Sequence, residues 1–160
     1  LDKFVGDQVM ALFGAPLPNP GHAYNAVKVA VDLQQEMQRT RRRWIEEGLL
    51  PGELVEANPE ILTLGVGINS GEMLLGLFGS AKANQYTVLG HHVNLAARLC
   101  SFASGNEVLA SLSTVQEISR YAKENPARIA IPIKFRTKAQ IEVKGIAEPV
   151  TVATLAYDQA

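Results

Sequence analysis

One stretch of the sequence decides the fold, and it reads Tyr86-Thr87-Val88-Leu89-Gly90-His91-His92-Val93-Asn94-Leu95-Ala96-Ala97-Arg98-Leu99. A short β-type run ends at Gly90, and a helical pattern begins directly after it. Asn94 and Arg98 are four residues apart, so both side chains project from one face of the predicted helix. An amide and a guanidinium on one face suit a phosphate or a developing negative charge, and a solvated polar face explains the pair equally well.

The other side of this helix carries an apolar stripe, formed by Val93, Ala96, Leu99 and Cys100. Cys100 is the only cysteine, which excludes an internal disulfide and a multi-cysteine metal site. Its place on the stripe predicts a buried structural thiol and fits a reduced, cytosolic setting.

The composition is that of an ordinary globular domain. The 160 residues are 47% hydrophobic and 19% charged, with a net charge of −1. This balance gives no bulk electrostatic reason to expect nucleic acid or an anionic membrane as a partner. No apolar run reaches the roughly 18 residues of a membrane helix, and no signal peptide is visible. Because the chain opens at Leu1 inside an apparent strand, we interpret it as part of a longer protein.

The pattern along the chain predicts an α+β fold. Two short strands are expected around Gly6-Asp7, then a Pro-rich loop over 15–21 and a long helix over 22–47. A loop covers 48–60, and Ser70-Gly71 is expected to turn one strand into the next. The remaining helices are expected from about 91 and over 114–124, and the remaining strands at 61–69, 73–78, 87–89, 107–110, 129–135, 141–143 and 150–155. This order predicts a ferredoxin-like sandwich, a mainly antiparallel sheet with helices on one face, in a single domain over 1–160.

Four further residues are candidates for chemistry, each with an ordinary structural explanation beside it. Asp7 at a hairpin tip suits the turn, and it also suits Mg²⁺ as one oxygen ligand. Lys3 shares a strand face with apolar neighbours and needs an acceptor there. Thr87 fits a strand by propensity, while its hydroxyl can bind a ligand. Lys144 is either a surface lysine or a phosphate ligand.

Taken together, these segments resemble the class III nucleotidyl cyclases, the adenylyl and guanylyl cyclases, and bacterial adenylyl cyclases in particular. The resemblance rests on motifs that occur in order at compatible spacing, and these are Lys3-Phe4-Val5-Gly6-Asp7-Gln8-Val9-Met10-Ala11-Leu12-Phe13, Gly65-Val66-Gly67-Ile68-Asn69-Ser70-Gly71-Glu72, Tyr86-Thr87-Val88-Leu89-Gly90, Val93-Asn94-Leu95-Ala96-Ala97-Arg98-Leu99 and Val143-Lys144-Gly145. They cover the chain from Lys3 to about Val150.

The resemblance implies a role for each candidate. Asn94 matches the asparagine that orients the ribose, and Arg98 matches the arginine on the transition-state phosphate. Lys3 and Thr87 match the adenine-reading pair, where guanylyl cyclases typically carry Glu and a small residue or Cys. Lys144 matches the lysine on the terminal phosphates, and Asp7 matches the second of two metal-binding aspartates.

The implied reaction is the conversion of ATP to cyclic AMP and pyrophosphate, with two divalent metal ions, Mg²⁺ or Mn²⁺, as cofactors. The implied assembly is a homodimer whose sites lie at the interface, the metal aspartates coming from one chain and the nucleotide contacts from the other. A cytoplasmic location and regulatory domains elsewhere in a longer protein are expected.

The sequence departs from the family at two places. The strand that carries the first metal aspartate is absent, so we expect an N-terminally truncated domain with little activity by itself. His91 stands where an aspartate commonly follows Gly90, either as a tolerated cap or as a pH-sensitive neighbour of the site. Three alternatives stay open: a catalytically inactive dimerisation module, a guanylyl cyclase and an unrelated ferredoxin-like binding domain.

Overall fold

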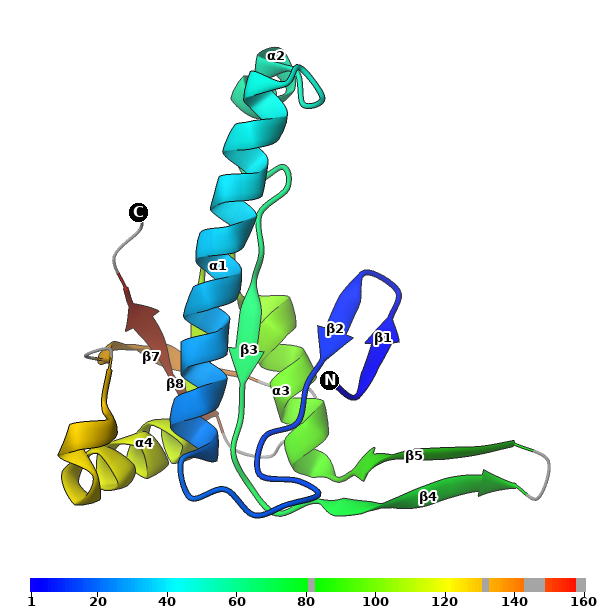
Figure 1. Ribbon diagram of the computed structural model, residues 1–160, viewed down its shortest axis with the longest axis vertical. Helices are drawn as coiled ribbons and strands as arrows, with labels where there is room; N and C mark the ends of the chain where they lie inside the picture. The colour runs from blue at the N-terminus through cyan, green and yellow to red at the C-terminus, as the bar shows by residue number, and fades with distance from the viewer. Residues whose placement is uncertain (81–82, 131–132, 143–148, 158–160) are drawn as a thin grey trace.

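A four-stranded sheet forms the centre of the computed structural model, which describes residues 1–80, 83–130, 133–142 and 149–157 (Figure 1). Strand β3 (Val66–Ile68) pairs in parallel with β6 (Val108–Ser111), and β6 pairs antiparallel with β8 (Val150–Ala156). Strand β7 (Lys134–Ile141) pairs antiparallel with β8, so the strand order is β3-β6-β8-β7. The expected α+β class with a mainly antiparallel sheet is confirmed.

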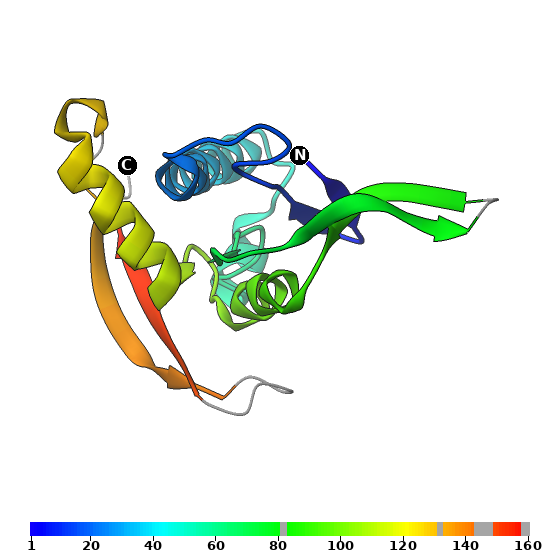
Figure 2. The same cartoon turned by 90° about the horizontal axis from the view of Figure 1, so that it is seen from below.

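Helices α1 (His22–Glu46) and α4 (Leu112–Glu124) cover one face of this sheet (Figure 2). An apolar cluster lies buried between them and the sheet, and its members are Ala23, Val27, Ala30, Val31, Ile68, Val108, Ala110, Ile118 and Leu155. Burying this surface is the main stabilising contribution on that face. Helix α4 begins with a capping bond, because the Ser111 hydroxyl accepts from the Thr114 backbone N at 3.3 Å.

Helix α3 (His91–Phe102) packs on the opposite face, which differs from the expectation that all helices lie on one face. Leu95 and Leu99 of α3 form a second buried cluster with Leu109 and Val152. The physical reason lies in β6, where every residue is buried, so both of its faces need a cover.

Two glycines let α3 approach the sheet closely. A Cβ atom on Gly67 of β3 would overlap the backbone of α3 at Cys100 and Ala96. A Cβ on Gly65 would lie 2.9 Å from the carbonyl oxygen of Ala103, just beyond the helix. The backbones of β3 and α3 therefore meet without a side chain between them at these positions.

Two hairpins extend from this body. Strands β1 (Lys3–Val5) and β2 (Gln8–Met10) form a short hairpin, with Gly6 at a φ of 62° as the first turn residue. Strands β4 (Leu74–Ser80) and β5 (Ala83–Leu89) form a long arm that projects away from the sheet (Figures 1 and 2).

The predicted hairpin through Ser70-Gly71 is wrong, because β3 pairs with β6 and β4 pairs with β5. The Ser70 hydroxyl instead accepts from the Thr114 hydroxyl at 3.0 Å, which ties the end of β3 to α4. Residues 79–80 and 83–85, which lie between the strands expected at 73–78 and 87–89, belong to paired strands. Where strands were expected at 129–135 and 141–143, the described residues form the single strand β7, with a 3₁₀ turn at Pro126–Arg128 before it, and residues 131–132 and 143 lie outside the described residues.

Helix α1 has the predicted extent, but its buried stripe is rotated from the one that helical spacing predicts, which is Ala26, Ala30, Leu33, Met37 and Trp44. Of the predicted stripe, Ala30 is buried while Leu33 is half exposed, at 50%. Gln34 is fully buried instead, and its Nε2 donates to the carbonyl oxygens of Leu64 at 2.7 Å and Glu107 at 3.3 Å. A second short helix, α2 (Gly52–Ala57), lies within the predicted loop. Within the described residues, no helix has both the length and the apolar character needed to cross a membrane.

Candidate active site

Asn94 and Arg98 lie on α3, which begins directly where β5 ends. Gly90 joins the two elements at a φ of 152°, a conformation that favours glycine, and its carbonyl oxygen accepts from the Val93 backbone N at 3.2 Å. Leu95 and Leu99 face the sheet, whereas Asn94 is exposed and Arg98 is half-buried. Among the described residues neither polar side chain has a hydrogen bond or an ion pair, so both are available to a ligand.

Lys3 and Thr87, the expected purine-reading pair, are brought together by a residue that the sequence analysis missed. The Thr87 hydroxyl donates to Oδ2 of Asp2 at 3.1 Å, and the Lys3 Nζ lies 3.6 Å from the same oxygen. These contacts join the β1–β2 hairpin to β5 near the start of α3. The signal available in the sequence was an acid next to a base at the start of a strand.

Asp7 lies at the tip of the β1–β2 hairpin and is exposed. A carboxylate suits a hard cation, but one carboxylate does not hold two ions. No group of three or more potential ligands that could hold a metal occurs among the described residues. The residues present therefore do not fit a two-metal centre by themselves. Lys144 lies outside the described residues.

The N-terminus of α3 is fixed by a polar contact that the sequence analysis also missed. Nδ2 of Asn69 lies 3.1 Å from Nδ1 of His92 and donates to the His92 carbonyl oxygen at 3.0 Å. Burial is the largest cause that lowers the pKa of His92, the neighbouring charge of His91 lowers it further, and Glu72 opposes both. The rings of His91 and His92 lie against each other, with 3.9 Å between their centroids and a tilt of 40° between their planes.

Hydroxyl groups continue this contact from the end of β3 to the start of α4. The Ser113 hydroxyl donates to the Ser70 carbonyl oxygen at 3.0 Å and lies 3.5 Å from Oδ1 of Asn69. Thr114, which is fully buried, shares hydrogen bonds of 3.0 Å with both Ser70 and Ser111. The loop that precedes the arm is thus held on both sides of the sheet.

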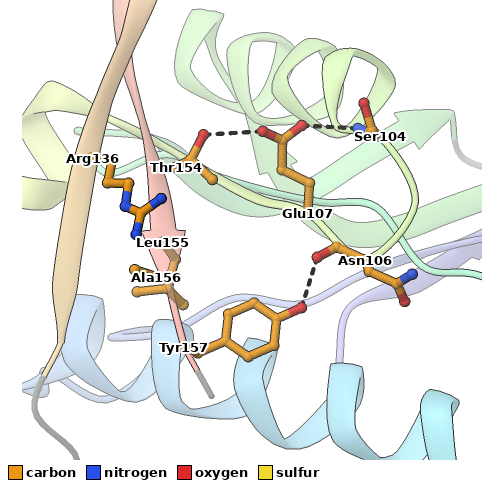
Figure 3. Close-up of a pocket in the computed structure, with 8 residues that line it drawn as sticks. All are labelled: Ser104, Asn106, Glu107, Arg136, Thr154, Leu155, Ala156 and Tyr157. Atoms are coloured by element: carbon orange, nitrogen blue, oxygen red, sulfur yellow. Dashed lines mark hydrogen bonds between the residues drawn. The ribbon is translucent and has the colours of Figure 1, made fainter. Parts of the chain in front are cut away.

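The structure also has a cavity of about 370 Å³ at the edge of the sheet, away from the expected site residues (Figure 3). Several of its polar groups are engaged in structural bonds, and Glu107 accepts from the Thr154 hydroxyl and the Ser104 backbone N, both at 3.0 Å. The Tyr157 hydroxyl donates to the Asn106 carbonyl oxygen at 2.7 Å. We therefore place the candidate site at α3 and the β1–β2 hairpin and not in this cavity.

Residues 3–155 match the family described as Adenylate and Guanylate cyclase catalytic domain. Adenylate cyclase 1 of Rhizobium meliloti is 30% identical over 151 residues, which take in 92% of this chain and 21% of that protein. An uncharacterized protein of Mycobacterium tuberculosis is 30% identical over 155 residues, or 94% of this chain and 24% of its own length. The chain thus spans about a quarter of the length of these curated relatives.

Solved structures give the same relationship. The adenylyl cyclase CyaB from P. aeruginosa superposes with a TM-score of 0.78 at 32% identity, covering 98% of this chain and 71% of that one. The guanylyl cyclase Cya2 superposes with a TM-score of 0.76 at 28% identity, covering 97% of this chain and 68% of that one. The fold alone therefore does not choose between ATP and GTP. Because the family match extends over nearly all of its length, this chain belongs to the adenylate and guanylate cyclase catalytic-domain family.

Proposed function

We propose that this chain is an adenylyl cyclase catalytic domain, which converts ATP to cyclic AMP and pyrophosphate. The observation that carries the proposal is the joining of Lys3, Asp2 and Thr87 at the end of β5, directly before the helix that bears Asn94 and Arg98. Lys3 has only donors to offer, which suits an acceptor nitrogen of the adenine ring.

In the proposed reaction the ribose 3′-oxygen attacks the α-phosphorus in line and loses its proton. The new bond closes the cyclic phosphate as the bond to pyrophosphate breaks. Asn94 holds the ribose, and the Arg98 guanidinium stabilises the charge that develops on the phosphate oxygens. Lys144 is proposed to bind the terminal phosphates. Positioning and charge stabilisation account for most of the catalysis, because the protein forms no covalent bond with the nucleotide.

The proposed catalyst is a homodimer. Large apolar side chains are exposed on both hairpins, and among them are Phe4 at 69%, Val9 at 60%, Leu74 at 72% and Leu77 at 70%. Large apolar side chains exposed on projecting hairpins are a feature of protein interfaces. Pairing two copies would cover this surface and bring the Asp7 of one chain toward the nucleotide contacts of the other.

Class III cyclases generally use divalent metal ions, and Asp7 supplies one carboxylate toward such a site. We infer that sequence upstream of Leu1 supplies the other aspartate and the missing strand, and that the longer protein carries regulatory domains. A cytoplasmic location is part of the same proposal, because ATP is the substrate.

The test is to extend the chain with its native upstream sequence and add ATP or GTP with Mg²⁺ or Mn²⁺. Cyclic AMP as the main product would support the proposal, whereas cyclic GMP as the main product would overturn the adenine assignment. A folded dimer that makes neither product would instead favour a catalytically inactive dimerisation module.

Arg98→Ala is the sharpest variant within that test. It should lower kcat by about 10²–10³-fold, because it removes a charge that stabilises the transition state. Dimerisation, measured by sedimentation, should be unchanged. Arg120→Ala on the exposed side of α4 is the matched control and should retain full turnover. Full turnover by Arg98→Ala would refute the proposed role of Arg98.

A further inference from the structure

We propose that Asp2 is a positioning residue that sets purine specificity. Its carboxylate holds the hydroxyl proton of Thr87, so that Thr87 presents only lone pairs to the purine. This inference rests on the proposed function, because it concerns how the same site distinguishes adenine from guanine.

The geometry places Asp2 between the two purine-reading residues. One oxygen, Oδ2, accepts from the Thr87 hydroxyl at 3.1 Å and lies 3.6 Å from Nζ of Lys3. The Asp2 side chain is only 6% exposed. Its backbone N donates to the carbonyl oxygen of Met10 at 2.8 Å, which fixes Asp2 at the open end of the β1–β2 hairpin.

The direction of the Thr87 hydrogen bond follows from burial and chemistry. Thr87 is 4% exposed, so its hydroxyl proton needs a partner inside the protein. An ionised carboxylate has acceptors only, so in this pair Thr87 must be the donor. With its one proton committed to Asp2, the hydroxyl retains two lone pairs and no donor for another partner.

The hydrogen bond from Thr87 to Asp2 therefore allows the site to distinguish adenine from guanine. Adenine carries an amino group at its 6-position, which donates, whereas guanine carries a carbonyl oxygen there, which accepts. A freely rotating hydroxyl would satisfy either group. A hydroxyl whose proton is bonded to Asp2 can accept a hydrogen bond from the adenine amino group. Against guanine, the hydroxyl oxygen and the carbonyl oxygen are both acceptors, so no hydrogen bond forms between them. Leaving such buried polar groups unpaired is what makes a hydrogen-bonding site selective.

The experiment measures the ratio of kcat/KM for ATP to that for GTP in the chain extended by its native upstream sequence. Asp2→Ala frees the Thr87 proton, so the ratio should fall by about tenfold or more. Asp2→Asn keeps an acceptor oxygen and should retain most of the preference. Asp32→Ala, which removes an exposed carboxylate from α1, is the matched control and should leave the ratio unchanged.

A double-mutant cycle separates this role from a merely structural one. Thr87→Val removes the hydroxyl, so in that background Asp2→Ala should cause little further change in the ratio. If Asp2 only stabilises the hairpin, its effect persists in the Thr87→Val background and falls on both nucleotides alike, which would overturn the inference.

The wild-type result distinguishes the two proposals. Wild-type protein that favours GTP refutes the adenylyl cyclase assignment and this inference together. Wild-type protein that favours ATP, with a ratio unchanged by Asp2→Ala, refutes only the inference. If wild-type protein turns over neither nucleotide, the ratio of ATP to GTP affinity, measured by competition with a fluorescent nucleotide, should show the same shift. No shift in that ratio refutes the inference.

Discussion

Among the described residues, the face of the sheet under α1 and α4 is filled by nine buried apolar side chains, whereas the face under α3 holds four. The candidate site residues Asn94 and Arg98 belong to the sparser face. On that face, close backbone contact at Gly67 and the Asn69–His92 hydrogen bonds position α3 more than the burial of large apolar side chains does. The comparison teaches that stability and positioning are assigned to opposite faces of one sheet.

Truncating one leucine or isoleucine on each face is the most severe way to test this division. Leu99→Ala and Ile118→Ala remove side chains that are 0% and 4% exposed, so each should lower the free energy of unfolding by about 2–4 kcal/mol. Only Leu99→Ala should also lower turnover at a temperature where both variants remain folded. Urea unfolding and a cyclase assay on the extended chain measure the two effects. Equal losses of turnover would break the comparison.

Gly67→Ala is expected to have the next largest effect. The added Cβ would push α3 away from β3, because the atoms it meets are backbone atoms that cannot rotate aside. We expect a loss of about 1–3 kcal/mol in stability, typical of overpacking. Gly52→Ala is the matched control, since a Cβ at Gly52 meets nothing within 4 Å and the residue begins a helix. A Gly67→Ala protein as stable as Gly52→Ala would show that the contact is not tight.

Thr114→Val tests the hydroxyl contacts that tie the end of β3 to α4. The substitution keeps the shape but removes the Thr114 hydroxyl that bonds Ser70 and Ser111. The Ser70 hydroxyl loses its partner, whereas Ser111 keeps its bonds to the Thr114 backbone N and to Ser113, so stability should fall by about 1 kcal/mol. Thermal unfolding measures the change. Ser119→Ala on the exposed surface of α4 removes a local bond to the Val115 carbonyl oxygen and should be nearly neutral. Equal losses in the two variants would contradict a role for the buried contacts.

The smallest expected effect concerns pH. Burial and His91 lower the pKa of His92 below its ordinary value of 6.5, so the folded protein favours the neutral ring more strongly than the unfolded chain does. This contribution to stability is fully present above pH 6.5 and is lost as the pH falls through the lowered pKa. The Tm should fall on acidification, and His92→Gln should make that fall shallower. If His92→Gln shows the same dependence of Tm on pH as the wild-type protein, His92 does not contribute to the loss of stability at low pH.

The sequence predicted the positions of helices and strands better than it predicted which strands pair with each other. The extent of α1 and the start of α3 were predicted correctly, because a long amphipathic period and a glycine before a helix are local signals. The pairing of β3 with β6 was missed, because strand propensity says nothing of which distant strand is adjacent. Leu33 was expected in the core in place of Gln34, because the pattern does not show that two backbone carbonyls accept hydrogen bonds from the buried amide nitrogen of Gln34.

The candidate site was predictable to a similar degree. The shared face of Asn94 and Arg98 follows from helical spacing, and the structure leaves both free of partners among the described residues. The roles assigned to them, to Lys3 and to Asp7 stay predictions. Asp2 was missed because its meaning depends on a contact with Thr87 across 85 positions of sequence, which no local pattern reveals.

The contact between β3 and α3 has a consequence for how this chain can vary. Every amino acid except glycine has a Cβ, so any missense change at Gly67 introduces an atom into the backbone of α3. Any residue other than glycine at position 67 therefore destabilises the contact between β3 and α3. We therefore expect substitutions in this domain to avoid position 67. The exposed positions of the β4–β5 arm are not constrained by packing within the chain and can change together with the partner surface that they contact.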